Sequence, residues 1–166
     1  SARLILQNPD DVGFFEQARV VDRGTIRLIP GSGVDCRRFV PNAGRRRGER
    51  FRVVLAARLL WDKGLAEYVE AARQLHAAGR GIDFLLAGDP DPGNPAAVPE
   101  AQIRGWVDEG LLQWLGHVDD MPALFASVDA AVLPSYREGL PKGLIEAAAS
   151  GLPLVTTDVP GCREVV

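Results

Sequence analysis

The apolar residues of this chain follow two patterns, short continuous runs and repeats spaced three or four positions apart. Short runs bounded by turn residues are typical of buried strands, and the wider spacing is typical of one face of a helix. One such helical face is aliphatic throughout: Leu65, Val69, Ala72 and Leu75. The runs predict strands at residues 3–7, 25–29, 51–56, 82–87, 112–115, 130–133 and 152–156. Helices are predicted at residues 8–18, around 65–75, 103–107 and 124–125, and from Pro141 onward.

From residue 51 onward the predicted strands and helices alternate, which favours a parallel sheet covered by helices on both faces. We therefore predict an α/β, Rossmann-like fold for residues 51–166. Residues 42–50 are rich in glycine and arginine and are expected to form a surface linker. The first strand-to-helix turn of the predicted domain lacks the glycine-rich fingerprint of dinucleotide-binding enzymes, so a redox enzyme is disfavoured.

The composition is that of a globular protein, with 166 residues, 46% hydrophobic and 25% charged, and a net charge of -3. This charge gives no overall attraction to nucleic acid or to an acidic membrane surface. The local basic cluster Arg45-Arg46-Arg47 is expected to be a solvated loop. The sequence has no apolar run of about 18 or more residues that would span a membrane. Its two distant cysteines favour a reducing compartment over a disulfide framework or a zinc site.

Two carboxylates lie in the segment that follows the predicted strand at 130–133, with Glu138 in the turn and Glu146 in the next helix. Ligands of parallel sheets bind beyond the carboxyl ends of the strands, where helix N-termini offer free N–H groups to anions. If the helix reached back to Glu138, both acids would lie on one face. The alternatives are a helix cap and a solvated surface residue. The apolar and small neighbours of Glu146 favour a site.

Two cations, Arg58 and Lys63, follow the strand at 51–56 and lead into the next helix. They are therefore predicted at the same end of the sheet as Glu138. Arginine grips phosphate oxygens with a fork of N–H groups and lysine acts as a point charge, so both suit an anionic ligand. A salt bridge of Lys63 with Asp62 or Glu67 is the alternative.

Three further loops hold residue types found at functional sites. Asp89 and Asp91 form an Asp-x-Asp pattern that can hold a divalent metal ion, but the prolines beside them favour a simple turn. Gly31 and Gly33 bracket a serine after a strand, yet the longer phosphate-binding fingerprint is missing. His117 lies in a loop at the same end of the sheet, where it is either a ligand contact or an ordinary polar loop residue.

The chain resembles the group-1 retaining glycosyltransferases at the two glutamates seven residues apart and at the segments around them: Glu138-Gly139-Leu140-Pro141, Glu146-Ala147, Gly151-Leu152-Pro153 and Gly161. The resemblance is to the bacterial surface-polysaccharide and lipid-linked glycan branch, and it covers nearly the whole chain. It implies the C-terminal half of a GT-B fold. Residues 1–30 would then end the N-terminal, acceptor-binding domain, residues 31–50 would be the linker, and residues 51–166 would be the donor-binding domain, cut short at its C-terminus.

The same resemblance implies a role for each candidate residue. Arg58 and Lys63 would bind the diphosphate of the donor, and Glu138 would face the donor sugar. Glu146 would accept hydrogen bonds from the ribose hydroxyls. The remaining contacts would come from the N–H groups of Gly139 and Leu140, near sugar and phosphate, and from the loop of His117, near the nucleotide.

The activity implied is transfer of a sugar, with retention, from a nucleotide-sugar donor to a glycan or polyprenyl-linked acceptor. The expected donor is UDP-linked, with an N-acetylhexosamine as the sugar. No cofactor, metal or nucleic-acid partner is expected, and the location implied is cytoplasmic, with peripheral association at the inner face of the cell membrane. We expect this part of the chain to bind donor without transferring sugar. Two alternatives stay open, a GT-B sugar-nucleotide epimerase or hydrolase and a non-catalytic nucleotide-binding module.

Overall fold

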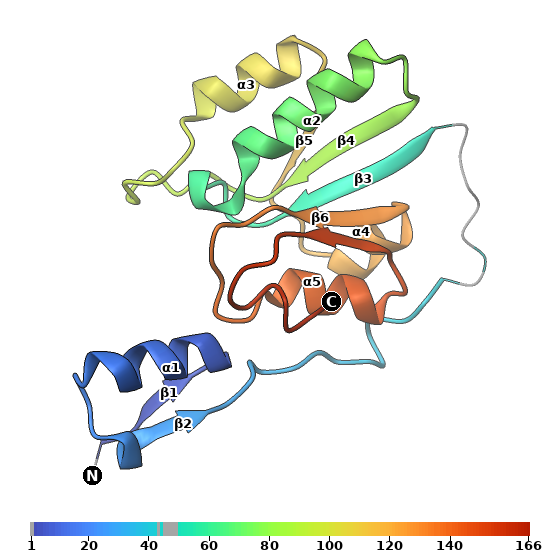
Figure 1. The fold of residues 1–166 in the computed structure, drawn as a ribbon. Helices are drawn as coiled ribbons and strands as arrows, with labels where there is room; N and C mark the ends of the chain where they lie inside the picture. The colour runs from blue at the N-terminus through green and yellow to red at the C-terminus, as the bar shows by residue number, and fades with distance from the viewer. Residues whose placement is uncertain (1, 43, 45–49) are drawn as a thin grey trace.

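The chain builds two separate parallel sheets, which the ribbon in Figure 1 shows one above the other. They are seen in a computed structural model that describes residues 2–42, 44 and 50–166. The basic cluster predicted at residues 45–47 lies outside the described residues. In chain order the elements are β1 (Leu4–Leu6), α1 (Pro9–Ala18), η1 (Arg23–Thr25), β2 (Ile26–Leu28), β3 (Phe51–Ala56), η2 (Trp61–Lys63), α2 (Leu65–Ala77), β4 (Ile82–Ala87), α3 (Glu100–Asp108), β5 (Gln113–Gly116), α4 (Met121–Ala126), β6 (Ala130–Leu133), α5 (Lys142–Ala149) and β7 (Leu154–Thr156).

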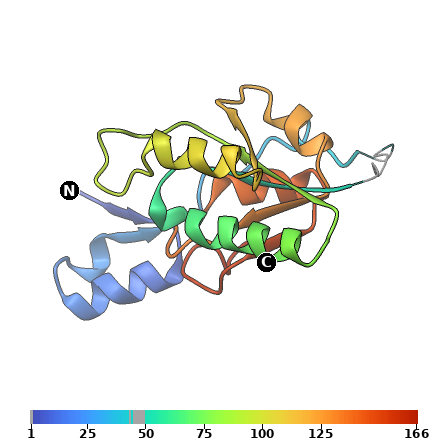
Figure 2. The same cartoon turned by 90° about the horizontal axis from the view of Figure 1, so that it is seen from above.

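The larger sheet has five parallel strands in the order β5-β4-β3-β6-β7. Successive side chains of a strand point to opposite faces, so the apolar run of β3 supplies two cores at once. Val53 and Leu55 pack with α2 and α3, whereas Val54 packs with α4 and α5. Figure 2 shows α2 and α3 side by side over one face. The predicted parallel sheet with helices on both faces is confirmed.

Tyr68 of α2 ties the helix to the two central strands. Its side chain is buried, and its hydroxyl oxygen lies 2.9 Å from the carbonyl oxygen of Leu85 in β4 and 3.1 Å from that of Val53 in β3. Burial raises the pKa of the phenol far above its ordinary value. The hydrogen bond to Leu85 lowers the pKa, but by less than burial raises it. The hydroxyl therefore stays protonated and donates to strand carbonyls inside the core.

The smaller sheet pairs β1 with β2 in parallel, and α1 connects them. We call residues 4–28 the N-terminal unit. The side chain of Asn8 caps α1 by accepting from the backbone N–H of Asp11 at 2.8 Å, as the predicted helix start requires. In Figure 1 this unit lies beside α5 and is joined to the large sheet by an extended segment. The assignment of residues 1–30 to an acceptor-binding domain stays a prediction.

Element bounds differ from the predicted ones mainly next to turns. α5 begins at Lys142, not at Pro141, because Pro141 keeps an extended conformation while its carbonyl accepts from Leu144 N–H at 3.1 Å. Glu138 is therefore outside the helix, and it does not share a helical face with Glu146. Gly151 follows the helix in a left-handed conformation, which is common where helices end. Among the described residues no helix has both the length and the apolar character needed to cross a membrane.

Candidate functional site

A cleft of about 350 Å³ opens at the carboxyl ends of the central strands. We call it the strand-end cleft. Its lining comes from the segments after β3, β4 and β5 and from α5, and its polar members include Arg58, Asp89, His117 and Glu146. Three of the seven predicted site residues, Arg58, His117 and Glu146, are thus brought together at one opening, where parallel sheets bind ligands.

Glycines let these segments approach one another closely. A β-carbon on Gly88 would lie 1.9 Å from the carbonyl oxygen of Ala57, and Gly88 has a positive φ of 141°. A β-carbon on Gly143, in the first turn of α5, would lie 3.2 Å from the carbonyl oxygen of Ala56. The loop after β4 and the start of α5 are therefore packed directly against the end of β3, which sets the width of the cleft.

Glu146 projects from α5 into the strand-end cleft. Only 12% of its side chain is exposed, and Nζ of Lys142, one helical turn earlier, lies 3.5 Å from Oε1. The lysine itself is 68% exposed, so it compensates the carboxylate weakly. A carboxylate held this way keeps acceptor capacity for hydroxyl groups of a ligand.

Arg58 and His117 each face an aspartate from the loop after β4. Arg58 Nη1 lies 3.1 Å from Asp91 Oδ2, and His117 Nδ1 lies 2.8 Å from Asp89 Oδ2. His117 Nε2 also lies 3.3 Å from Asp119 Oδ1. All these side chains are at least one-third exposed, so an incoming anion can compete for the two cations.

Both aspartates of the Asp-x-Asp pattern, Asp89 and Asp91, are therefore paired with basic side chains. Within the described residues no group of three or more histidine, cysteine or acidic side chains is arranged to hold a metal ion. The chain also turns just after Asp91, where the N–H of Asn94 donates to the Asp91 carbonyl at 2.9 Å. Metal-independent binding stays a prediction.

Lys63 and Glu138 form an ion pair beside the cleft, without lining it. Lys63 Nζ lies 2.6 Å from Glu138 Oε1, and the two side chains are 17% and 11% exposed. Lys63 reaches this position because Gly64 follows it with φ +75°, where a β-carbon would lie 2.1 Å from the carbonyl oxygen of Pro134. The sequence suggested Asp62 or Glu67 as a salt-bridge partner of Lys63, but in the structure the partner is Glu138.

The backbone beyond Glu138 offers free donors. Among the described residues, the N–H groups of Gly139 and Leu140 have no hydrogen-bond acceptor, and the segment leads directly into the N-terminus of α5. We call residues 137–140 the Glu138 turn. Unpaired N–H groups ahead of a helix N-terminus attract anions. The predicted site residues thus form two adjacent groups, Arg58, His117 and Glu146 in the cleft, and Lys63, Glu138, Gly139 and Leu140 beside it.

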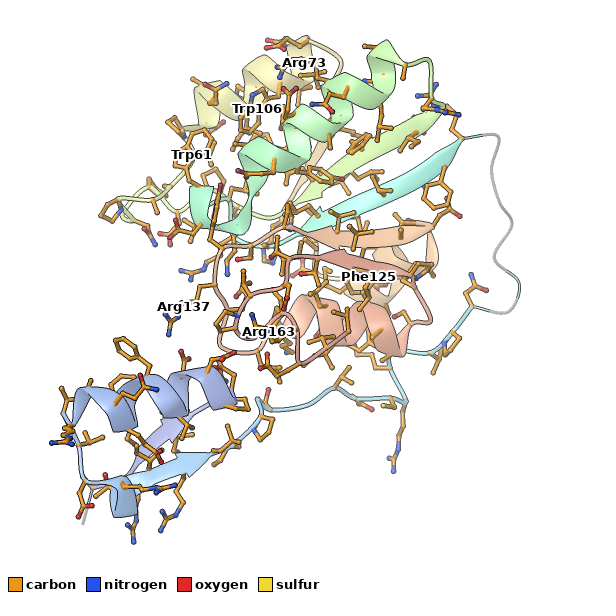
Figure 3. The ribbon with its side chains drawn as sticks, in the orientation of Figure 1. Trp61, Arg73, Trp106, Phe125, Arg137 and Arg163 are labelled. Atoms are coloured by element: carbon orange, nitrogen blue, oxygen red, sulfur yellow. The ribbon has the colours of Figure 1, made fainter. Side chains whose placement is uncertain are left out.

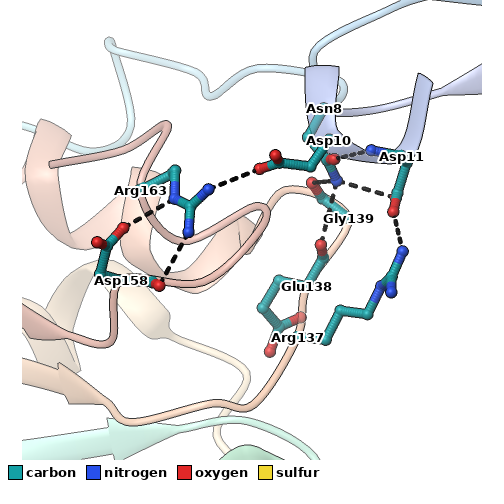
Figure 4. Close-up of polar contacts among 8 residues, drawn as sticks. All are labelled: Asn8, Asp10, Asp11, Arg137, Glu138, Gly139, Asp158 and Arg163. Carbon is teal, nitrogen blue, oxygen red and sulfur yellow. Dashed lines mark hydrogen bonds and ion pairs between the residues drawn. The ribbon is translucent and has the colours of Figure 1, made fainter. Parts of the chain in front are cut away.

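Sequence reasoning missed the contact of the N-terminal unit with this site. The start of α1 contacts loops next to the larger sheet through three side chains, those of Asn8, Asp10 and Asp11 (Figure 4). Arg137 and Arg163, labelled in Figure 3, are the basic partners. The local pattern Asn-Pro-Asp-Asp indicates a helix start and carries no information about a partner distant in the sequence.

Residues 50–166 match the family described as glycosyl transferases group 1. A relative from Campylobacter jejuni, N,N'-diacetylbacillosaminyl-diphospho-undecaprenol alpha-1,3-N-acetylgalactosaminyltransferase, is 35% identical over 114 residues, which are 69% of this chain and 28% of the relative. Glycogen synthase of Mycobacterium tuberculosis is 31% identical over 137 residues, which are 81% of this chain and 32% of the relative.

The fold is also found in solved structures. The crystal structure of Anabaena Alr3699/HepE in complex with UDP and glucose superposes on 100% of this chain with a TM-score of 0.81, at 21% identity, and the match covers 47% of that protein. The predicted architecture, the C-terminal half of a GT-B fold, is confirmed. This chain spans less than half the length of each of these three proteins.

Proposed function

This chain belongs to the group 1 glycosyl transferases, and from that premise we propose that it binds the nucleotide-sugar donor of a retaining glycosyltransferase. The observation that carries the proposal is the position of Glu146. It is an almost buried carboxylate in a cleft at the strand ends, with Arg58 and His117 on the opposite segments. A carboxylate accepts two hydrogen bonds from a vicinal diol, as on ribose, and the basic groups suit phosphate.

The Lys63–Glu138 pair and the Glu138 turn form the second part of the proposed donor site. Negative charge accumulates on the diphosphate as the sugar leaves. A preorganised lysine and free N–H groups would stabilise that charge more strongly in the transition state than in the ground state. Glu138 would hold Lys63 in place and face the sugar. Support comes from the short distance of this ion pair and from the free donors at Gly139 and Leu140.

For the whole protein we propose a UDP-linked donor, with an N-acetylhexosamine as its sugar, and a polyprenyl-linked or glycan acceptor at the inner face of the cell membrane. The names of relatives support this assignment, since the Campylobacter jejuni protein is named for an N-acetylgalactosaminyl transfer to a diphospho-undecaprenol acceptor. The Anabaena structure holds UDP and glucose. The acceptor would be held by a part of the protein outside residues 51–166, because transfer requires both substrates in one closed cleft.

Calorimetric titration with UDP, GDP and ADP tests the donor site. We expect selective binding of UDP and a loss of about tenfold or more in Glu146→Gln, since a hydrogen bond to a charged group contributes about 1.5–3 kcal/mol. The matched control is Glu70→Gln, an exposed glutamate of α2 that lies away from the cleft and should leave UDP binding unchanged. Equal UDP affinity of Glu146→Gln and the unmodified protein would overturn the assignment of Glu146. Absence of nucleotide binding by the folded protein would count against donor binding by this chain.

A further inference from the structure

We propose that Asn8 is a positioning residue, which sets the conformation of the Glu138 turn from the N-terminal unit. Its side chain is fully buried, at 0% exposure. Nδ2 of Asn8 donates to the carbonyl oxygen of Gly139 at 2.9 Å and approaches that of Glu138 at 3.3 Å (Figure 4). The same nitrogen lies 2.9 Å from Asp11 Oδ2. Asn8 thus joins α1 to a turn that lies 130 residues further along the chain.

Both polar atoms of the Asn8 side chain make hydrogen bonds. An asparagine amide has two N–H donors and one carbonyl acceptor. The acceptor caps α1 through the N–H of Asp11, and the donors serve Asp11 and the two turn carbonyls. Because the group is buried, losing these bonds would leave carbonyl oxygens unsatisfied, which is costly. The bonds therefore fix how the turn is oriented.

The Glu138 turn is also held from its other side. The N–H of Glu138 donates to the carbonyl of Pro160 at 3.1 Å. A β-carbon on Gly161 would lie 2.3 Å from the Glu138 carbonyl oxygen, so the two segments are in direct contact. On the side of the N-terminal unit, a β-carbon on Gly139 would lie 2.2 Å from Oε1 of Gln7. The backbone of Glu138 is thus clamped between Gln7-Asn8 and Pro160-Gly161, and this clamp determines where its carboxylate meets Lys63.

Two ion pairs join the first turn of α1 to segments on either side of Glu138. Asp11 pairs with Arg137 of the Glu138 turn, and Asp10 Oδ2 lies 2.9 Å from Arg163 Nη1. Arg163 also contacts Asp158 Oδ1 at 2.8 Å. Figure 4 shows these pairs on either side of Asn8. The arginines are exposed, so each pair contributes little free energy alone, and their effect is to restrict how α1 can rotate.

Asn8 touches the Glu138 turn and does not line the strand-end cleft. This inference rests on the proposed function, in which the turn faces the donor sugar and the diphosphate, and the cleft holds the remainder of the nucleotide. It follows that loss of the Asn8 donors should weaken binding of the sugar nucleotide more than binding of UDP, which contacts only part of the turn. A merely structural role would lower both together through partial unfolding.

The test uses Asn8→Ser, because serine keeps the cap on α1 but is too short to donate to the turn carbonyls. The matched control is Asp22→Ser, in which serine replaces the cap of η1 within the same N-terminal unit. The first measurement is hydrogen exchange at the amide of Glu138, which needs no ligand. We expect exchange at least tenfold faster in Asn8→Ser than in Asp22→Ser, with the amides of α2 unchanged in both. Equal exchange at Glu138 in the two variants would overturn the proposal.

The second measurement compares the dissociation constant of UDP with those of UDP-glucose and UDP-N-acetylglucosamine. We expect Asn8→Ser to lose at least fivefold more affinity for the sugar nucleotide that the unmodified protein prefers than for UDP. Parallel loss for UDP and sugar nucleotides would contradict a positioning role. If the unmodified protein binds none of these ligands, the proposed function fails, and hydrogen exchange at Glu138 still decides the role of Asn8.

Discussion

Lys63 Nζ lies 2.6 Å from Glu138 Oε1, and this contact joins two loops that are 75 residues apart in the sequence. Both side chains are mostly withdrawn from water. Two separately predicted site residues are therefore one electrostatic unit. Each side chain compensates the charge of the other in a setting that is largely withdrawn from water.

This pairing predicts strong coupling between the two residues. Removing one partner of a buried pair leaves an uncompensated charge, whereas removing both does not. We expect Lys63→Met and Glu138→Gln each to lower the free energy of unfolding by about 1–3 kcal/mol, and the double variant to lose less than the sum. Urea denaturation of the four proteins measures this. The exposed pair Arg73 and Glu70 should show no comparable coupling, and additive losses at Lys63 and Glu138 would contradict the prediction.

A second prediction concerns the close contact of Gly161 with the Glu138 carbonyl. Alanine at 161 meets both an unfavourable φ of +84° and a backbone oxygen 2.3 Å away. The control Gly79→Ala has a similar φ of +68° but nothing within 4 Å of the added carbon. We expect Gly79→Ala to cost about 1 kcal/mol, and Gly161→Ala to cost at least about 2 kcal/mol more. Chemical denaturation provides both values, and equal losses would show that the contact is not tight.

Tyr68 gives a prediction about alkaline pH. Burial raises the pKa of its phenol in the folded protein, so above about pH 10 the unfolded chain releases this proton first. The stability contributed by Tyr68 is complete below that pH and is lost as pH rises, by about 1.4 kcal/mol per pH unit. Tyr68→Phe removes this dependence, and at neutral pH it should cost about 0.5–1.5 kcal/mol for the lost hydrogen bond. Parallel curves of unfolding free energy against pH for the two proteins would contradict this assignment.

Asp91 is predicted to compete with the nucleotide for Arg58. The two side chains form an exposed pair at the cleft, so Asp91→Asn frees the arginine for phosphate. Exposed pairs are worth up to about 1 kcal/mol, so UDP affinity should rise by up to about fivefold at low salt and less at high salt. The matched control is Glu100→Gln, which frees Arg104 of α3 outside the cleft. Calorimetry that shows unchanged or weaker binding in Asp91→Asn would rule out this competition.

The two cysteines should differ sharply in reactivity. Cys36 is exposed, whereas Cys162 is buried beside the Glu138 turn. Burial raises the pKa of the Cys162 thiol and outweighs the hydrogen bond with Thr156, which lowers that pKa. The fraction of reactive thiolate is therefore reduced. We expect iodoacetamide to label Cys36 in the native protein and Cys162 only in denaturant, as read by peptide mass spectrometry. Rapid native labelling of Cys162 would show that the region opens.

The alternation of strands and helices was predictable because each element carries its own periodicity. The run at 51–56 coincides with β3, since both faces of that strand are buried and nearly every position is apolar. The start of α5 was misplaced by one residue, because a proline suits both the cap and the first helical position. Local sequence patterns predict the type of an element well, but they predict its terminal residues less accurately.

The site was predictable in its parts and not in its contacts. Arg58, Lys63, Glu138 and Glu146 lie at the predicted end of the sheet, because the carboxyl ends of parallel strands meet there. Which acid pairs with Lys63 depends on how the loops pack, and no local pattern encodes that. Asn8 is a second contact that could not be predicted from a local pattern. Its helix cap is local, but its partners in the Glu138 turn lie 130 and 131 residues away.

The central position of β3 has a consequence for how the protein is made. Val53 of β3 pairs with Phe84 of β4 on one side and with Ala130 of β6 on the other (Figure 1). β3 is the first strand of this sheet to be synthesised, but its second neighbour, β6, is made only after β4 and β5. Until β6 is synthesised, one edge of β3 stays unpaired and apolar, which is the condition under which nascent chains associate wrongly. Arg58 and His117 can then be in place before Glu146 exists. We expect chaperones to protect the nascent protein at this stage, when the cleft still lacks its α5 side.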